Sequence, residues 1–252
     1  MTRKKKRYKA LMIDVDATLI PNREDGMPSQ KVTNAINNAS EKIHIGVATS
    51  RPQFMLSHIF SHLKLSGPSI INGGSQIMDV SSGNILWEQS LLLEDYKKVR
   101  AILDKTKYAF YIHDQEKDFG NKDNYVPKNP LNVGCINLTP DQADKLIDIL
   151  SYIPTIAVHK VPDWVKNRFT VFISHAAATK QHGILEIAKI LNIKTHDIIG
   201  IGDGYNDFPL LMACGLKVAM GNAVPELKEI ADYIAPRVEE DGVADVIEKF
   251  VL

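Results

Sequence analysis

The chain contains a series of short apolar runs, and four of them end at a cluster of polar residues. The first runs span residues 10–13, 43–48 and 69–71, and later ones span 197–201, 217–220 and 233–235. Segments of helical periodicity separate most of them, for example 31–41, 52–63 and 184–191. Short buried strands that alternate with helices are typical of a parallel sheet. The sequence therefore predicts an α/β fold.

The middle of the chain has a different pattern. Strands are expected at 85–89, 109–113, 132–137, 155–161 and 169–174, and helices at 93–105 and 140–152. Thr139 and Pro140 are a natural N-cap and first position for the second of these helices. We therefore expect a compact α+β unit, residues 84–176, inserted into a larger domain made of 1–83 and 177–252.

The zero net charge of the chain argues against a nucleic-acid-binding protein. Lysine and arginine number 30, aspartate and glutamate also number 30, and the formal net charge is zero. Six positive charges lie among the first nine residues, where a solvated tail is the expected structure.

No apolar run approaches the ~20 residues that a membrane-spanning helix needs, so we expect no membrane partner. Two cysteines are too few for a disulfide framework, and buried free thiols in a cytoplasmic protein are expected.

Carboxylates follow two of the predicted strands. Asp14 and Asp16 follow the first strand, and Asp203 and Asp207 follow the strand at 197–201. Like charges this close need a cation or a proton for compensation, although a turn whose aspartates accept backbone N–H bonds would also explain each pair. A dinucleotide-binding fingerprint is excluded, because its third glycine position is occupied by Tyr205.

Hydroxyl and cationic side chains occur at the same edge of the predicted sheet. Thr49, Ser50 and Arg51 end the strand at 43–48, and Lys180 opens the helix that contains 184–191. A helix N-terminus with hydroxyl donors is a common anion site, although simple N-capping by Ser50 fits the same residues. In open α/β sheets, ligands bind at the carboxyl ends of the strands.

In combination, these elements resemble the haloacid dehalogenase superfamily of phosphohydrolases. Its four motifs occur in order: D-x-D-x-T at Asp14–Thr18, a threonine at Thr49, a lysine at Lys180, and G-D-G-x-N-D at Gly202–Asp207. Asn72-Gly73-Gly74 and residues 219–223 and 241–244 are similar to its Cof-type branch, which carries a type IIB cap between the second and third motifs. The resemblance implies a Rossmann-like parallel-sheet core with 84–176 as the cap.

The resemblance also implies roles for the motif residues. Asp14 would form an aspartyl phosphate, and Asp16 would act as general acid and then base. Mg²⁺ would be bound by Asp14, Asp203, the Asp16 carbonyl and Asp207, unless Asp207 acts through water or orients Lys180. The expected phosphate and substrate contacts are Thr18, Thr49, Ser50, Arg51, Asn206 and Lys180.

The function implied is a magnesium-dependent phosphatase of small phosphate monoesters, with sugar phosphates as the expected substrates, acting as a monomer or homodimer. A hexose phosphomutase of the same fold is an alternative, although the complete fourth motif favours a phosphatase. A sensor that binds phospho-ligands without turnover is a second alternative, because Ala17 and Ser50 replace the glycines usual at these positions. Residues 118–129 of the cap, and His113, His159 and His175, are open candidates for substrate contact.

Overall fold

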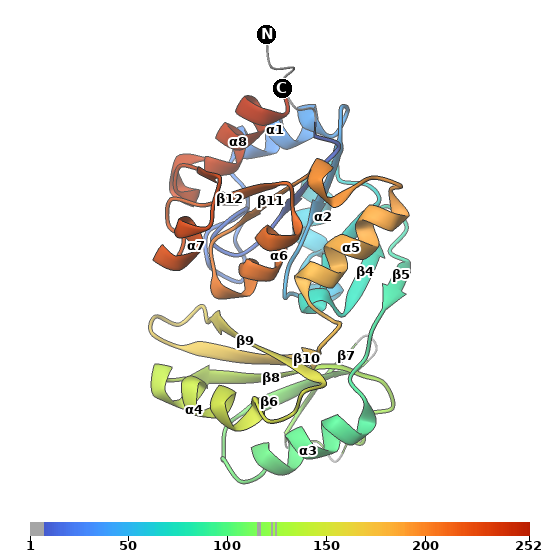
Figure 1. Cartoon of the computed structure of the whole chain (residues 1–252), viewed down its shortest axis with the longest axis vertical. Coiled ribbons are helices and arrows are strands. Elements are labelled where there is room, and N and C mark those ends of the chain that lie inside the picture. Colours follow the sequence, from blue (N-terminus) through green and yellow to red (C-terminus); the bar gives the residue numbers. More distant parts are fainter. Residues whose placement is uncertain (1–7, 115–116, 122, 124) are drawn as a thin grey trace.

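The computed structural model describes residues 8–114, 117–121, 123 and 125–252. It contains two bodies of different size, seen one above the other in Figure 1. The larger has a hydrophobic core drawn from residues 10–78 and 184–247, and the smaller has one drawn from residues 91–173. The basic head at residues 1–7 and Lys122 lie outside the described residues.

The larger body is built on a parallel five-stranded sheet with the order β13-β12-β11-β1-β2. β1 lies between β11 and β2, and Ile13 pairs with Ile201 and Val47. All four residues of β1 are buried, as expected for a strand covered on both faces. The strands are β1 (Ala10–Ile13), β2 (His44–Val47), β11 (Ile198–Gly202), β12 (Leu216–Ala219) and β13 (Tyr233–Ile234).

A small antiparallel sheet of three strands extends this body beyond β2. Its strands are β3 (Pro68–Ile71), β4 (Gln76–Asp79) and β5 (Ile85–Glu88). A single parallel bridge between Ala48 and Ile70 joins β3 to the end of β2. The strand at β4 was not expected from the sequence. β5 lies inside the predicted insertion, yet it pairs with β4 of the larger body.

The smaller body is an antiparallel sheet with the order β7-β6-β8-β10-β9, covered on one face by two helices. Ile112, Val133 and Ile173 pair across its centre and belong to the core formed with these helices. Their neighbours therefore face the larger body, because side chains alternate along a strand. The elements are α3 (Leu93–Leu103), β6 (Phe110–Asp114), β7 (Lys117–Gly120), β8 (Pro130–Leu138), α4 (Pro140–Leu150), β9 (Ile156–Pro162) and β10 (Phe169–His175).

The helices of the larger body pack in pairs, with α1 against α8 and α5 against α6. They are α1 (Gln30–Ala39), α2 (Ser57–His62), α5 (Lys180–Ile190), α6 (Phe208–Ala213), α7 (Pro225–Glu229) and α8 (Gly242–Phe250). The single helix predicted over 52–63 is instead a 3₁₀ turn at Gln53–Met55 followed by α2.

Local sequence signals explain where helix α4 begins. Thr139 begins α4 with a capping box, in which the Thr139 hydroxyl accepts from the backbone N–H of Gln142 and Oε1 of Gln142 accepts from the backbone N–H of Thr139. Both cysteines are free, Cys135 buried and Cys214 half-buried, as expected. Within the described ranges, no helix is long and apolar enough to cross a membrane.

Candidate active site

The catalytic candidates gather where the parallel strands end. Asp14 follows β1, and its backbone N–H donates to the carbonyl of Ile201 in β11 at 2.9 Å. Because β1 and β11 are parallel and in register, Asp14 and Asp203 leave the sheet side by side. Thr49 follows β2 in the same way, so one edge of the sheet carries three of the four predicted motifs.

Three carboxylates form a compact group at this edge. One side-chain oxygen from each of Asp14, Asp203 and Asp207 lies within 4.8 Å of the others. Asp14 and Asp207 are buried, and Asp203 is half-buried. Negative charge concentrated in a buried place fits a hard divalent cation, for which carboxylate oxygens are the preferred ligands. The donor set therefore fits Mg²⁺.

Lys180 bridges two members of this group. Its Nζ donates to Oδ1 of Asp14 at 2.6 Å and to Oδ1 of Asp207 at 2.5 Å, and the residue is 2% exposed. Burial by itself lowers the pKa of Lys180, but the charges of Asp14 and Asp207 outweigh it and raise that pKa above its ordinary value. Lys180 is therefore a fixed positive charge beside Asp14.

Asp207 has both carboxylate oxygens engaged by the protein. While Oδ1 accepts from Lys180, Oδ2 accepts from the backbone N–H groups of Asp203 and Gly204, both at 3.0 Å. A Cβ at Gly202 would lie 2.4 Å from Cγ of Asp207, so only glycine permits this approach. Of the three roles considered for Asp207, which are direct metal binding, action through water and orientation of Lys180, these contacts favour the last.

The clustering raises the pKa values of the other two carboxylates, Asp14 and Asp203. Burial and the charges of Asp207 and Asp203 raise the pKa of Asp14 well above its ordinary value, against the opposing effect of Lys180. Burial and the charge of Asp207 raise the pKa of Asp203 to about 7. One lysine does not compensate three carboxylates, which is a further reason to expect a bound cation here.

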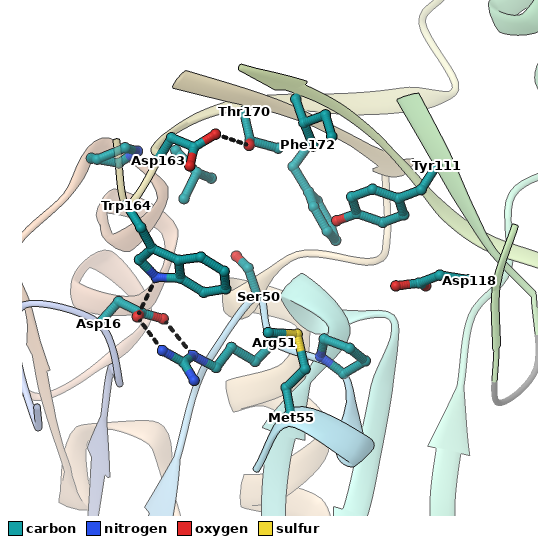
Figure 2. A pocket seen from close by; sticks show the side chains of 14 residues that line it. Asp16, Ser50, Arg51, Met55, Tyr111, Asp118, Asp163, Trp164, Thr170 and Phe172 are labelled. Atoms are coloured by element: carbon teal, nitrogen blue, oxygen red, sulfur yellow. Dashed lines mark hydrogen bonds and ion pairs between the residues drawn. The ribbon is translucent and has the colours of Figure 1, made fainter. Parts of the chain in front are cut away.

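The Asp16 side chain forms an ion pair with Arg51 (Figure 2) and is not a member of the carboxylate group. Arg51 donates from Nε to Oδ2 at 2.9 Å and from Nη2 to Oδ1 at 2.7 Å, the fork geometry of a bidentate pair. The indole Nε1 of Trp164 also donates to Oδ1, at 3.2 Å. The Asp16 side chain is thus absent from the carboxylate group, and the expected metal contact through its backbone carbonyl remains a prediction.

Four other residues were predicted to contact the phosphate or the substrate, and two of them, Thr18 and Thr49, form hydrogen bonds within the protein. The hydroxyl of Thr18 donates to Oδ1 of Asp203 at 3.0 Å, which places it beside a metal-ligand candidate. The hydroxyl of Thr49 accepts from the backbone N–H of Arg51 at 3.1 Å, and Thr49 is buried. Ser50 lines a cavity beside Asp16. Asn206 lies next to Gly204 in the fourth motif.

The loop that follows β1 contains a backbone conformation that explains why glycine is usual at position 17. Ala17 has φ 57°, in the left-handed region that costs residues with a Cβ about 1–2 kcal/mol. Its carbonyl accepts from Nδ2 of Asn222 at 2.8 Å, so the loop is held from the other end of the chain. Glycine is usual here because this turn requires positive φ.

Sequence reasoning missed Trp164 and the bracing role of Asn222. Trp164 lies in the β9–β10 turn of the smaller body, 148 positions from Asp16, and nothing near it marks a contact with the catalytic loop. Asn222 was recognised only as part of a family-like segment. Of the open candidates, Asp118 lines the cavity beside Asp16, whereas Tyr125 lines a separate cavity.

The cavity beside Asp16 has a volume of about 360 Å³ and lies between the two bodies. The larger body contributes Asp16 from the loop after β1 and four residues of the segment 50–55 after β2, and the smaller body contributes one face of its sheet and the β9–β10 turn. The lining residues are Asp16, Ser50, Arg51, Pro52, Met55, Tyr111, Asp118, Ile136, Val161, Pro162, Asp163, Trp164, Thr170 and Phe172.

Several known proteins with similar sequences or structures are named phosphatases. The chain is 28% identical to phosphoglycolate phosphatase 2 of Saccharolobus solfataricus, over 94% of this chain and 90% of that one. It is 25% identical to the 5-amino-6-(5-phospho-D-ribitylamino)uracil phosphatase YcsE of Bacillus subtilis, over 97% and 96%. The fold matches the HAD subclass IIB sugar phosphatase BT4131 with a TM-score of 0.80, at 21% identity, covering 96% of this chain and 98% of that one.

The family model for haloacid dehalogenase-like hydrolases matches residues 11–133 and 122–247. The matched stretches contain all four motifs that gather at the strand ends. The resemblance seen in the sequence is confirmed, together with the α/β fold and the enzyme class it implied, a phosphatase. This chain belongs to the haloacid dehalogenase-like hydrolase family.

Proposed function

We propose that the protein is a magnesium-dependent phosphatase that hydrolyses small phosphate monoesters, with sugar phosphates as its main substrates, through an aspartyl-phosphate intermediate. The observation that carries the proposal is the placement of Asp14: a buried carboxylate at a strand end, bonded to Lys180 and grouped with Asp203 and Asp207. A nucleophile, a fixed cation and further cation ligands are the parts that phosphoryl transfer needs.

Asp14 attacks phosphorus in the proposed reaction. A carboxylate is a competent nucleophile only when ionised, and burial opposes ionisation of Asp14. Lys180 favours the ionised form through its 2.6 Å hydrogen bond. When bound by Asp14 and Asp203, Mg²⁺ supplies the rest of the charge neutralisation. Lys180 and Thr49 then hold the phosphate oxygens in place.

Asp16 handles the proton at the leaving-group oxygen. It donates that proton as the ester bond breaks, and it then takes a proton from the water that attacks the aspartyl phosphate and restores Asp14. Its contacts with Arg51 and Trp164 set the direction of the carboxylate toward the cavity where the leaving group binds. Arg51 therefore positions Asp16, in place of the direct substrate contact expected from the sequence.

The smaller body is proposed to act as the cap that closes over the substrate. The expected range was 84–176, but β5 pairs with β4 of the larger body, so we propose that the cap begins at Gln89–Leu91 and ends near residue 176. The named relatives act on phosphoglycolate, a phosphorylated ribitylaminouracil and a sugar phosphate, so small phosphate esters are the common element. A monomer or homodimer in the cytoplasm remains our expectation.

The test is Asp14→Asn, assayed with p-nitrophenyl phosphate in the presence of Mg²⁺. Turnover should fall at least 10³-fold, because the amide cannot form the covalent intermediate. Asp148→Asn is the matched control, since Asp148 is exposed on α4 of the cap. Wild-type activity should disappear with a chelator and return with Mg²⁺. Unchanged turnover in Asp14→Asn would refute the mechanism.

Two further assays separate the alternatives. Incubation with a hexose phosphate should release inorganic phosphate; an isomerised hexose phosphate without free phosphate would indicate a mutase. Tight binding of sugar phosphates with no hydrolysis in Mg²⁺ or other divalent ions would indicate the sensor.

A further inference from the structure

The cavity beside Asp16 has an unusual balance of charge for a site that receives phosphate esters. Among its described lining residues the acids are Asp16, Asp118 and Asp163, and Arg51 is the one lysine or arginine. Arg51 already makes four hydrogen bonds to protein, two to Asp16 and one each to the carbonyls of Arg23 and Glu24. Little of its donor capacity remains for an anionic group on a substrate.

Asp118 and Asp163 face the cavity from opposite sides (Figure 2). Asp118 is at the β7 side, where Oδ1 contacts Nδ1 of His113 and the side chain is 34% exposed. Asp163 is at the β9–β10 turn, where Oδ2 accepts only long bonds, 3.3 Å from the N–H of Asn137 and 3.5 Å from the hydroxyl of Thr170. Both carboxylates therefore retain capacity to accept hydrogen bonds from a bound group.

The cavity walls between these two carboxylates are apolar and aromatic. Tyr111 and Phe172 project from the exposed face of the cap sheet, and Trp164 closes the opposite side. Gly134 is needed for this wall, because a Cβ there would lie 2.2 Å from Cζ of Tyr111. Burial, with the charges of Asp118 and Asp163, raises the pKa of Tyr111, so its hydroxyl stays protonated at neutral pH.

We propose that this cavity selects the leaving group by charge: it accepts uncharged hydroxyl-bearing or cationic leaving groups and rejects those that carry a carboxylate or a second phosphate. Hydroxyl or ammonium groups donate to Asp118 and Asp163, while the carbon skeleton lies against Trp164 and Phe172. An anionic leaving group would lose its hydration beside two like charges, and no lysine or arginine with free donors lies among the described lining residues to compensate it. This inference rests on the proposed phosphatase function.

Three phosphate esters of nearly equal size isolate the effect of charge. They are 2-hydroxyethyl phosphate, O-phosphoethanolamine and 2-phosphoglycolate, whose leaving groups end in a hydroxyl, an ammonium and a carboxylate. Each is measured as a substrate and as a competitor of p-nitrophenyl phosphate hydrolysis. We expect the kcat/KM of the first two to exceed that of phosphoglycolate at least tenfold, with inhibition constants in the same order.

Variants of the two acids connect the selectivity to the cavity. Asp163→Asn and Asp118→Asn should each raise the kcat/KM for phosphoglycolate several-fold relative to that for phosphoethanolamine, whereas the surface control Asp148→Asn should leave the ratio unchanged. One substitution lies on β7 and the other in the β9–β10 turn, so a folding defect in one of them does not affect the test with the other.

The possible failures are distinguishable. Preference for phosphoglycolate, or equal kcat/KM and inhibition constants for all three esters, would overturn the charge selection while the phosphatase assignment stands. Ratios unaffected by both Asp→Asn variants would also overturn it. Absence of hydrolysis of p-nitrophenyl phosphate together with all three esters would instead refute the proposed function.

Discussion

The indole Nε1 of Trp164 donates a 3.2 Å hydrogen bond to Oδ1 of Asp16, and this bond joins the cap to the catalytic loop. The same indole lies over the guanidinium of Arg51, with 5.3 Å between the ring centroid and Cζ. Arg51 in turn holds both oxygens of Asp16. The orientation of Asp16 therefore depends on a residue of the smaller body, so the proposed closure of that body as a cap would be linked to the placement of the acid.

Trp164→Phe tests this link, because phenylalanine keeps an aromatic ring beside Arg51 and removes the N–H donor. We expect kcat to fall about tenfold for an alkyl phosphate, the size of effect produced by losing one hydrogen bond to a charged group. p-Nitrophenyl phosphate should lose much less, because its leaving group departs without protonation. Steady-state kinetics on both substrates provide the comparison. Equal losses on the two would show that Trp164 has no effect specific to the acid step.

Lys180 allows a second prediction, in which stability and activity change together. Lys180→Met leaves the buried carboxylates of Asp14 and Asp207 without their cation, and breaking a buried pair in this way costs about 3–5 kcal/mol. Urea unfolding without divalent ions should show a loss of that order, and turnover should fall at least 10²-fold. Lys180→Met combined with Asp207→Asn should recover part of the stability without recovering activity. If the single variant is as stable as wild type, the charge compensation assigned to Lys180 is wrong.

The arrangement of the core was predictable because each motif directly follows a strand or opens a helix. Asp14, Thr49 and Asp203 belong together because parallel neighbours deliver their carboxyl ends to one edge, and that relationship is visible in the order of apolar runs. Lys180 was likewise expected where a helix opens, and it is the first residue of α5. These contacts require only the topology and the register.

The contacts between core and cap were not predictable in the same way. Trp164 and Asp163 lie in a turn whose sequence shows only local signals, and their approach to Asp16 depends on how one body sits on the other. β4 and β7 were missed for a related reason, since both are four-residue strands that depend on hairpin partners rather than on an apolar run of their own. Tertiary context decides such elements.

The carboxylate group also predicts how stability depends on pH. The pKa of Asp203 is raised from 3.8 to about 7, and that of Asp14 is also raised, both chiefly by burial. Without a divalent ion, the folded state therefore holds protons that the unfolded chain has already lost. The free energy of unfolding should fall as pH rises from about 4 to 7, since stability decreases wherever the folded state binds more protons.

Thermal unfolding in the presence of a chelator measures this contribution. The difference in Tm between wild type and Asp203→Asn should move in favour of the variant as pH rises through that window, whereas Asp148→Asn should follow wild type throughout. Added Mg²⁺ should raise the wild-type Tm more at pH 8 than at pH 5, because metal binding needs the deprotonated carboxylates. A Tm difference that is constant with pH would contradict the raised pKa of Asp203.

Ala17 provides the final prediction, at a position where the chain departs from its family's usual sequence. With φ 57°, Ala17 bears a strain that glycine would not, so Ala17→Gly should raise the free energy of unfolding by up to about 1 kcal/mol. Ala101 is the matched control, because it is an exposed alanine inside α3, where glycine should instead cost about 1 kcal/mol. Urea unfolding of the two variants should therefore give shifts of opposite sign. If both variants lose stability, the left-handed conformation of Ala17 is not a strained one, and the loop tolerates alanine because Asn222 and the flanking residues hold it without cost.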